Sequence, residues 1–178
     1  MGAQLPAGDF VTWLGEIGSA LAGVGESDVP CGTCTACCRS GQFVHIGPDE
    51  AQALAAIPAD LLFPAPGLAP GYLVLGYDQQ GRCPMLGKAG CTVYQARPRT
   101  CRVYDCRIFA ATGVVVDEPG KAAIAEQAAR WRFSAASADA QERLDALRES
   151  GAALGRDKAT QALPATARAL AALRHALA

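Results

Sequence analysis

CGTCTACC, residues 31–38, holds four of the eight cysteines in this chain of 178 residues. The other four follow in a segment rich in Arg, Pro and Tyr, at Cys83, Cys91, Cys101 and Cys106. The sequence has no cysteine outside this window. We therefore expect the chemistry of the protein between residues 31 and 106, and we interpret the flanking segments as its support.

The first three cysteines have the spacing of a metal-binding loop. Cys31 and Cys34 are two residues apart, so a tight turn can point both sulfurs at one ion, and the glycine between them permits that turn. Cys37 extends the series to three. Such a series resembles the C-x2-C-x2-C run that holds three irons of a [4Fe–4S] cluster, whose fourth ligand is a distant Cys followed by Pro. Cys83 is followed by Pro84, which favours an Fe–S cluster.

Zinc is the second metal that these donors allow. Four thiolates at about 2.3 Å from zinc form an ordinary structural site. Such a site usually consists of two separated C-x2-C pairs, whereas the later cysteines here are separated by seven, nine and four residues. An Fe–S cluster, for example 4Fe-4S, and zinc both remain open. All eight cysteines are predicted metal ligands: Cys31, Cys34, Cys37, Cys38, Cys83, Cys91, Cys101 and Cys106.

The adjacent pair Cys37 and Cys38 limits how the sulfurs are shared. Neighbouring side chains usually diverge, so two adjacent cysteines rarely hold the same ion. We predict one ligand set that contains the first three cysteines and Cys83. Cys38 is predicted to join a second group with Cys91, Cys101 and Cys106.

The N-terminal segment and the charge balance predict the cellular location and the classes of binding partner of the protein. The segment lacks the basic residues and the continuous apolar stretch of an export signal. We therefore expect a cytosolic protein, in which clustered cysteines bind metal or carry redox chemistry more often than they form disulfides. No stretch approaches the roughly 20 apolar residues of a membrane span. Sixteen basic and seventeen acidic residues nearly cancel, which predicts no nucleic-acid or membrane partner.

The expected fold is small and α+β. It comprises a metal-stabilised, irregular cysteine-rich core with short strands, an N-terminal helix and a C-terminal helical bundle. We expect a metal-binding domain with its N-terminal helix at residues 1–110 and a helical region at residues 111–178. Asp9 is the expected N-cap of the first helix, because apolar residues recur after it at steps of three and four.

Local patterns predict the remaining elements. Three prolines between residues 60 and 71 make a regular element there unexpected. Ser137 is the expected cap of one C-terminal helix. The predicted strands are 42–46, 72–75 and 114–117, and the predicted helices are 48–57, 120–133, 139–154 and 164–177. We interpret the C-terminal helices as a structural bundle, with a docking surface for a protein partner as the alternative.

Other polar residues near the cysteines have less specific roles. We interpret His45, on an apolar strand, as a packed or capped residue that could support the ligands rather than join them. Six arginines lie near cysteines in the sequence: Arg39, Arg82, Arg97, Arg99, Arg102 and Arg107. Four thiolates around zinc, or around an oxidised [4Fe–4S] cluster, carry a net charge of about −2, which guanidinium groups would offset. A pocket for an anion or a cofactor carboxylate is the alternative role.

Three motifs together resemble the YkgJ-type cysteine-cluster family, also called the CxxCxxCC or zinc- or iron-chelating domain. They are CGTCTACC, GRCPML and CTVYQARPRTCRVYDC, and the resemblance covers about residues 31–109. It implies metal or Fe–S binding by the cysteines and supplies no substrate. A similar motif occurs in flagellin lysine methylases, which resemble users of an Fe–S cluster and S-adenosylmethionine. This sequence shows no methyl-donor site that would extend that activity to it.

Two function hypotheses follow. The first is a cytosolic metal-binding protein that acts as a redox, metal-delivery or metal-dependent modification component. The second is a non-catalytic interaction module in which zinc ties loops together and the helical tail binds a protein partner. The sequence leaves open whether the protein is an enzyme.

Overall fold

The computed structural model describes residues 2–27 and 29–177 and contains both helices and short strands, so the α+β expectation is confirmed. The chain divides into two compact units. The first comprises Met1–Gly25 and Asp105–Ala178, and the second is Glu26–Tyr104. These units differ from the expected division at residue 110, because the N-terminal strand and helix contact C-terminal elements. Whether 1–110 and 111–178 are separate domains stays a prediction.

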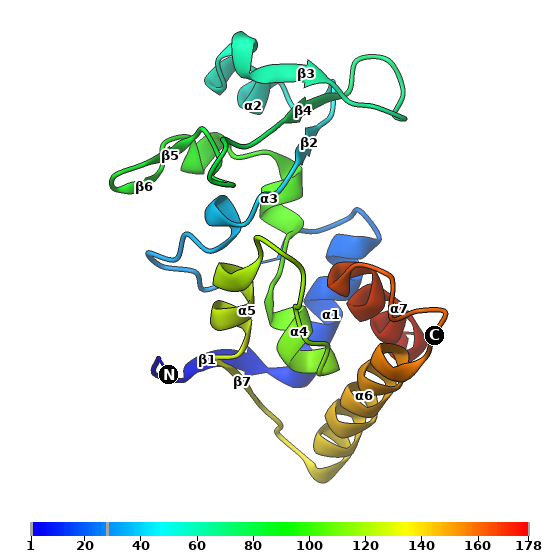
Figure 1. The fold of residues 1–178 in the computed structure, drawn as a ribbon. Helices are drawn as coiled ribbons and strands as arrows, with labels where there is room; N and C mark the ends of the chain where they lie inside the picture. The colour runs from blue at the N-terminus through cyan, green and yellow to red at the C-terminus, as the bar shows by residue number, and fades with distance from the viewer. Residues whose placement is uncertain (1, 28, 178) are drawn as a thin grey trace. The chain divides into compact units, whose positions relative to one another are not determined.

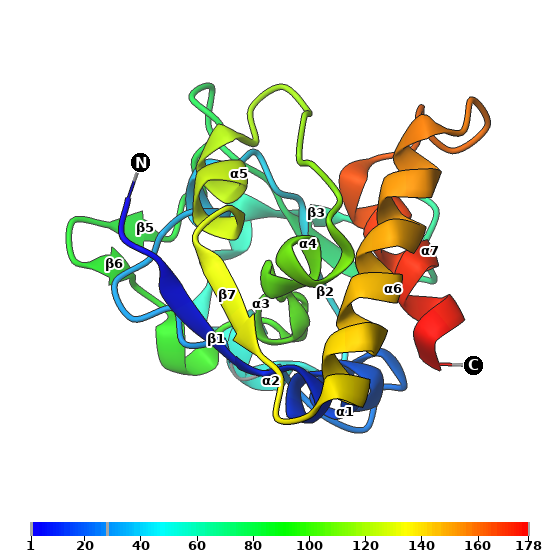
Figure 2. The same cartoon turned by 90° about the horizontal axis from the view of Figure 1, so that it is seen from below.

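The first unit contains a short parallel strand pair. Strand β1 (Leu5–Asp9) pairs with β7 (Trp131–Ser134), and the two lie side by side in Figure 2. Helix α1 (Phe10–Leu21) follows β1 directly. The Asp9 carboxylate accepts a hydrogen bond of 3.0 Å from the backbone N–H of Thr12, so its prediction as N-cap is confirmed.

A buried polar network joins three segments of this unit. The Trp13 indole N–H donates to Asp105 Oδ2 over 2.9 Å, and the same carboxylate pairs with Arg107 at 2.8 Å. Arg107 also donates to the backbone carbonyl of Ala7 over 3.1 Å. Both charged side chains are buried, so each depends on the other for its stability in the protein interior.

Helices make up most of the remaining first unit. They are α4 (Arg107–Thr112), α5 (Ala122–Ala128), α6 (Ala138–Arg156) and α7 (Ala165–Leu177). The predictions for the last two helices are confirmed, and Ser137 caps α6 by accepting a hydrogen bond from the backbone N–H of Ala140. Across the described residues, no helix combines the length and apolar character needed to cross a membrane.

Two predictions for this unit are wrong. The predicted helix 120–133 ends early because the chain becomes extended at Trp131 to pair with β1. Residues 114–117 have no strand partner in the described chain. Instead, the carbonyl of Val115 accepts a hydrogen bond of 3.3 Å from Arg168 of α7, and the Asp117 carboxylate pairs with the same guanidinium at 2.8 Å.

The second unit contains a three-stranded antiparallel sheet in the order β2 (Val44–Ile46), β4 (Leu73–Leu75), β3 (Leu62–Pro64), drawn in Figure 1. The two predicted strands here are confirmed, as is the helix after the first of them, which is α2 (Ala51–Ala56). The expectation of no regular element in 60–71 is wrong, because β3 ends at Pro64 and occupies the edge of the sheet, where a proline is tolerated.

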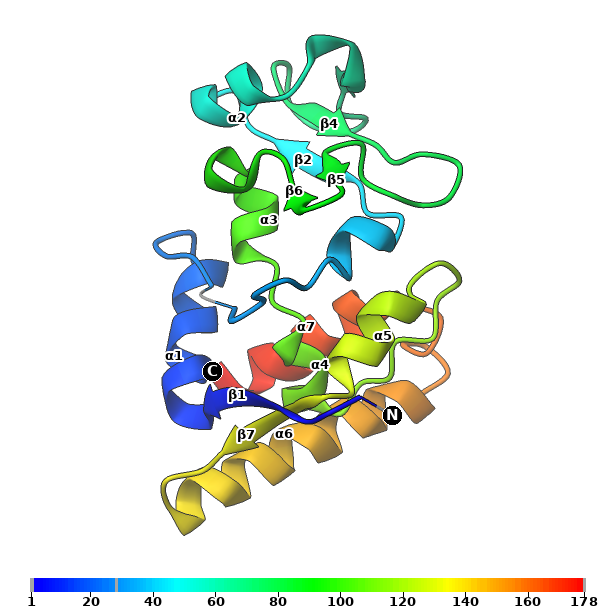
Figure 3. The same cartoon turned by 90° about the vertical axis from the view of Figure 1, so that its left-hand side faces the viewer.

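Short elements complete the second unit. They are the hairpin strands β5 (Leu86–Gly87) and β6 (Gly90–Cys91), helix α3 (Arg99–Val103), and 3-10 turns at Cys37–Arg39, Ala59–Leu61 and Tyr94–Ala96. Figure 3 shows the β5–β6 hairpin and α3. A small apolar core contains Val44, Ile46, Ala53, Ile57, Leu75 and Met85, with Cys83 packed against it. This core therefore holds Cys83, one of the four later cysteines, in place.

Helix α6 packs against the end of α4 at Gly151. A substitution at this glycine tests the packing of the first unit. A methyl group at residue 151 would overlap the carbonyl oxygen of Thr112, whereas one at Gly155 in the same helix has room. We expect Gly151→Ala to lower the free energy of unfolding by about 1–3 kcal/mol through overpacking. The matched control Gly155→Ala should leave it unchanged or raise it by up to about 1 kcal/mol.

Urea unfolding followed by tryptophan fluorescence measures this difference, because both tryptophans of the chain, Trp13 and Trp131, lie in the first unit. Equal unfolding midpoints for the two variants would contradict the predicted contact between α6 and the end of α4.

Candidate metal centre

The first two cysteines lie in a tight turn of the predicted kind. The backbone N–H of Cys34 donates to the carbonyl of Cys31 over 2.8 Å, and Gly32 has a φ of +52°, which favours glycine. The backbone N–H of Ala36 approaches the Cys34 sulfur at 3.5 Å. These two hydrogen bonds fix the conformation of the Cys31–Cys34 turn.

A backbone hydrogen bond joins the two halves of the cysteine window. Cys37 and Cys38 lie in the short 3-10 turn, and the N–H of Cys83 donates to the carbonyl of Cys38 over 2.7 Å. The turn is held on its other side by the buried Ser40 hydroxyl, which donates to the carbonyl of Ala36 over 2.7 Å. The bond between Cys83 and Cys38 therefore brings together two cysteines that are 45 positions apart in the sequence.

The β5–β6 hairpin returns Cys91 towards Cys83. The N–H of Leu86 donates to the carbonyl of Cys83 over 3.0 Å, and Leu86 lies opposite Cys91 in the hairpin. Thr92 secures the return, because both its backbone N–H and its hydroxyl donate to the carbonyl of Met85, at 2.9 and 3.0 Å. Residues 87–90 form the turn of this hairpin.

Helix α3 carries Cys101 and contacts strand β2. The Thr100 hydroxyl donates to the carbonyl of His45 over 2.6 Å. The backbone N–H of Arg99 donates to the carboxylate of Glu50. These two bonds fix the start of the helix against the sheet, and so determine where Cys101 lies within the second unit.

The thiols of this unit influence one another electrostatically. Burial raises the pKa of Cys38 to about 11, and the neighbouring thiols of Cys83, Cys91, Cys34 and Cys31 add to the increase. Burial also raises the pKa of Cys83, with a further contribution from Cys91.

The pKa of Cys101 is raised further than that of Cys38. Desolvation raises its pKa to about 12, with contributions from Cys38, Cys83 and Cys91, while the Arg97 charge acts in the opposite direction. The residue as a whole is exposed, so it is the surrounding protein at the sulfur that disfavours the thiolate. Without a cation, these thiols remain protonated near neutral pH.

The donor set fits a soft metal. Thiolates prefer zinc, copper(I) and Fe–S clusters, and a bound cation would remove the mutual repulsion that raises these pKa values. Within residues 2–27 and 29–177, no group of three or more His, Cys, Asp or Glu side chains is arranged to hold an ion. The thiols are therefore neighbours whose charges interact, and not a closed coordination shell.

Cys106 belongs to the first unit, unlike the other seven cysteines. Its side chain is buried, and its sulfur accepts a hydrogen bond of 3.2 Å from the Trp131 indole N–H. Its role as a ligand stays a prediction. The hydrogen bond gives this thiol a packing function in the first unit, which its position in the sequence window did not indicate.

His45 does not have the packed side chain that its apolar neighbours predicted. Val44 and Ile46 are buried on one face of β2, so the side chain between them points to the opposite face and is exposed. The packed interpretation is therefore wrong. His45 acts through its backbone carbonyl, which accepts the Thr100 bond.

Three of the six arginines near the cysteines pair with carboxylates. Asp78 pairs with Arg82 at 2.9 Å, Glu26 pairs with Arg102 at 2.6 Å, and Arg107 has the buried partner described above. Arg97 differs, because its guanidinium lies 4.1 Å from the centre of the Tyr94 ring and its charge favours the Cys101 thiolate. Charge compensation at the thiols is therefore best supported for Arg97.

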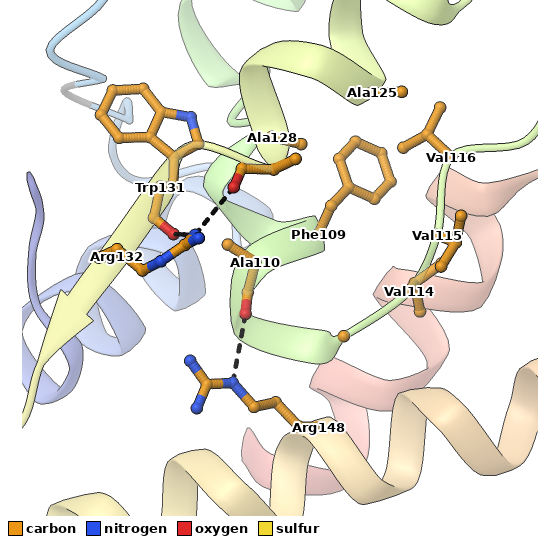
Figure 4. A pocket seen from close by; sticks show the side chains of 12 residues that line it. Phe109, Ala110, Val114, Val115, Val116, Ala125, Ala128, Trp131, Arg132 and Arg148 are labelled. Carbon is orange, nitrogen blue, oxygen red and sulfur yellow. Dashed lines mark hydrogen bonds between the residues drawn. The ribbon is translucent and has the colours of Figure 1, made fainter. Parts of the chain in front are cut away.

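The first unit contains a cavity of about 320 Å³ with a mainly apolar lining that includes Phe109, Val114 and Val116, shown in Figure 4. Two arginines, Arg132 and Arg148, also line this cavity. The Arg132 guanidinium donates to the carbonyls of Ala129 and Trp131, and Arg148 pairs with Asp145 at 3.2 Å. No cysteine lines this cavity, so we do not assign the metal chemistry to it.

Comparison with known proteins supports the assignment of the cysteine segment. The comparisons with curated proteins and with solved structures gave no match. One family model, CxxCxxCC, described as "Putative zinc- or iron-chelating domain", matches residues 30–127. The matched region covers all eight cysteines and more than half of the chain. This protein therefore belongs to the CxxCxxCC zinc- or iron-chelating domain family.

Proposed function

We propose that this protein is a cytosolic metal-binding protein whose cysteines in Glu26–Tyr104 hold zinc or an Fe–S cluster. The observation that carries the proposal is that segments distant in the sequence bring six thiols of one unit close enough for their charges to interact. None of the eight cysteines, all of which are described, forms a disulfide, which fits a reducing compartment such as the cytosol, where disulfides are rare. A redox or metal-delivery role suits such a site.

The residues present fit both metals. Cysteine thiolates are the ligands of structural zinc and of Fe–S clusters. A bound zinc would supply a fixed charge that ties the loops together, and an Fe–S cluster would supply one-electron redox chemistry. The protein's own contribution is to hold the thiols together, to keep them partly out of water, and to place the Arg97 charge beside Cys101.

Metal analysis of the full chain tests the proposal. After anaerobic purification, we expect zinc or iron to be bound, with acid-labile sulfide and visible absorption where an Fe–S cluster is present. Replacing the cysteines of the second unit by Ser should abolish loading. The matched control Cys106→Ser, in the first unit, should retain the metal. Purified and reconstituted protein that binds neither metal would refute the proposed function.

The raised thiol pKa values predict a pH dependence of metal affinity. Cys38 and Cys101, with pKa values of about 11 and about 12, are protonated at neutral pH, so a metal must displace their protons. Zinc affinity should therefore rise between pH 6 and pH 8, by about tenfold per pH unit for each proton released.

Competition with a chromophoric chelator measures this slope, and calorimetry in buffers of different ionisation enthalpy counts the released protons. A zinc affinity that is constant over this range, after correction for the chelator, would contradict the assignment of these thiols as ligands.

Arg97 gives a test of the charge compensation. Its guanidinium favours the Cys101 thiolate, so Arg97→Ala should weaken zinc binding at pH 7 by about two- to fivefold, as expected for a partly exposed charge pair. Arg82→Ala is the matched control, because that arginine pairs with Asp78, and it should leave the affinity unchanged. The effect of Arg97→Ala should shrink at high salt. Equal affinities for the two variants would show that Arg97 does not stabilise the bound thiolates.

A further inference from the structure

We propose that the cavity of the first unit binds a small monocarboxylate with an apolar body, the class of a short- or medium-chain fatty acid. The apolar body fills the cavity, and the carboxylate binds Arg132 and Arg148. Every residue that lines the cavity belongs to the first unit. The site is therefore separate from the thiols of the second unit, and the inference goes beyond the proposed metal-binding function.

The cavity has the size and lining of a small-molecule site. Its volume of about 320 Å³ lies within the range of about 300–1,000 Å³ that such sites have. The buried rings of Phe109 and Trp131 supply apolar surface. Apolar cavities take up apolar molecules, so an alkyl chain suits this lining. Small side chains leave the space open, because several lining residues are alanine or glycine: Ala110, Gly113, Ala125, Ala128 and Ala129.

The wall formed by residues 114–116 is held in place without a ligand. Arg168 of α7 donates to the Val115 carbonyl over 3.3 Å and pairs with Asp117 at 2.8 Å. The Arg168 side chain is buried, so packing fixes its position and the wall is fixed with it. A cavity that exists before binding spares the ligand the conformational cost of forming it.

The charges that line the cavity are positive. Among the described residues that line it are Arg132 and Arg148, but no acidic side chain. Arg148 pairs with Asp145 at 3.2 Å in a largely exposed contact, which is weak enough for a ligand carboxylate to share or replace. Within residues 2–27 and 29–177, no carboxylate pairs with Arg132. A ligand with one negative charge therefore complements the site.

Both guanidinium groups are positioned by backbone carbonyls. Arg132 Nη1 donates to the carbonyls of Ala129 and Trp131 over 2.8 and 2.7 Å, and Arg148 Nε approaches that of Ala110 at 3.5 Å. Figure 4 shows these bonds, with the two guanidinium groups on one side of the view and the valines on the other. Each guanidinium has five N–H donors, so donors are left for a carboxylate, with which arginine forms charge-assisted hydrogen bonds.

Calorimetric titration of the full, unmutated chain with hexanoate tests the proposal. We expect one hexanoate per chain, with a Kd of about 1 mM or tighter. Hexan-1-ol should bind about tenfold more weakly and hexylammonium should not bind, because only hexanoate has a charge that complements the arginines. Hexanoate that does not bind, or that binds no more tightly than hexan-1-ol, would overturn the proposal.

Single substitutions locate the bound ligand. Arg132→Gln and Arg148→Gln should each weaken hexanoate binding by about three- to tenfold, as expected for a partly exposed charge-assisted contact. Their matched control is Arg143→Gln, which removes the same charge from an exposed position of α6 outside the lining and should leave the affinity unchanged. Equal affinities for all three variants would refute the role of the two arginines.

A cavity-filling variant tests the apolar part of the site. Ala125→Leu places a larger side chain at the lining and should abolish hexanoate binding, whereas Ala122→Leu, at an exposed position of α5 outside the lining, should retain it. Urea unfolding followed by tryptophan fluorescence checks that both variants keep the fold of the first unit, which contains both tryptophans. A folded Ala125→Leu protein that binds hexanoate as tightly as the wild type would show that the ligand binds outside the cavity.

Discussion

Backbone hydrogen bonds that hold cysteines from distant parts of the chain together are the constraint on which the second unit depends. Six sulfur groups from distant parts of the chain lie close enough for their charges to interact, and burial adds to the cost of ionising them. The fold keeps them together as neutral thiols through backbone bonds such as that between Cys83 and Cys38. When a cation replaces the protons, each thiolate is attracted to the cation, which offsets the repulsion between the thiolates. Metal binding and the stability of this unit are therefore coupled.

Local signals in the sequence predicted local structure well. The Asp9 and Ser137 caps, the long C-terminal helices and the central strands of the second unit all follow from residue type and periodicity. The β1–β7 pair could not be predicted in this way, because Pro6 and Gly8 weaken one strand pattern and the other strand continues an Ala-rich helical segment. Only the tertiary pairing makes these residues extended.

The candidate site was predicted in part. Residue type and spacing identified the cysteine window and the turn at Cys31, and membership of the zinc- or iron-chelating family supports metal binding. Spacing could not show that the turn after Cys37 bonds to Cys83, since a contact across 45 positions leaves no local pattern. It also gave no sign that Cys106 accepts a bond from an indole of its own unit, because that partner, Trp131, lies on an unpredicted strand.

The interrupted first unit has a consequence for the order of events during synthesis. Residues 26–104 are inserted between the two pieces of that unit, so the ribosome completes the cysteine segment before Trp131–Ser134 exists to pair with Leu5–Asp9. A nascent chain at that stage carries an unpaired strand at its beginning and a complete set of second-unit cysteines. The strand is short and contains a proline, which limits association with other chains. The thiols can therefore meet their metal while the other unit is still unfinished.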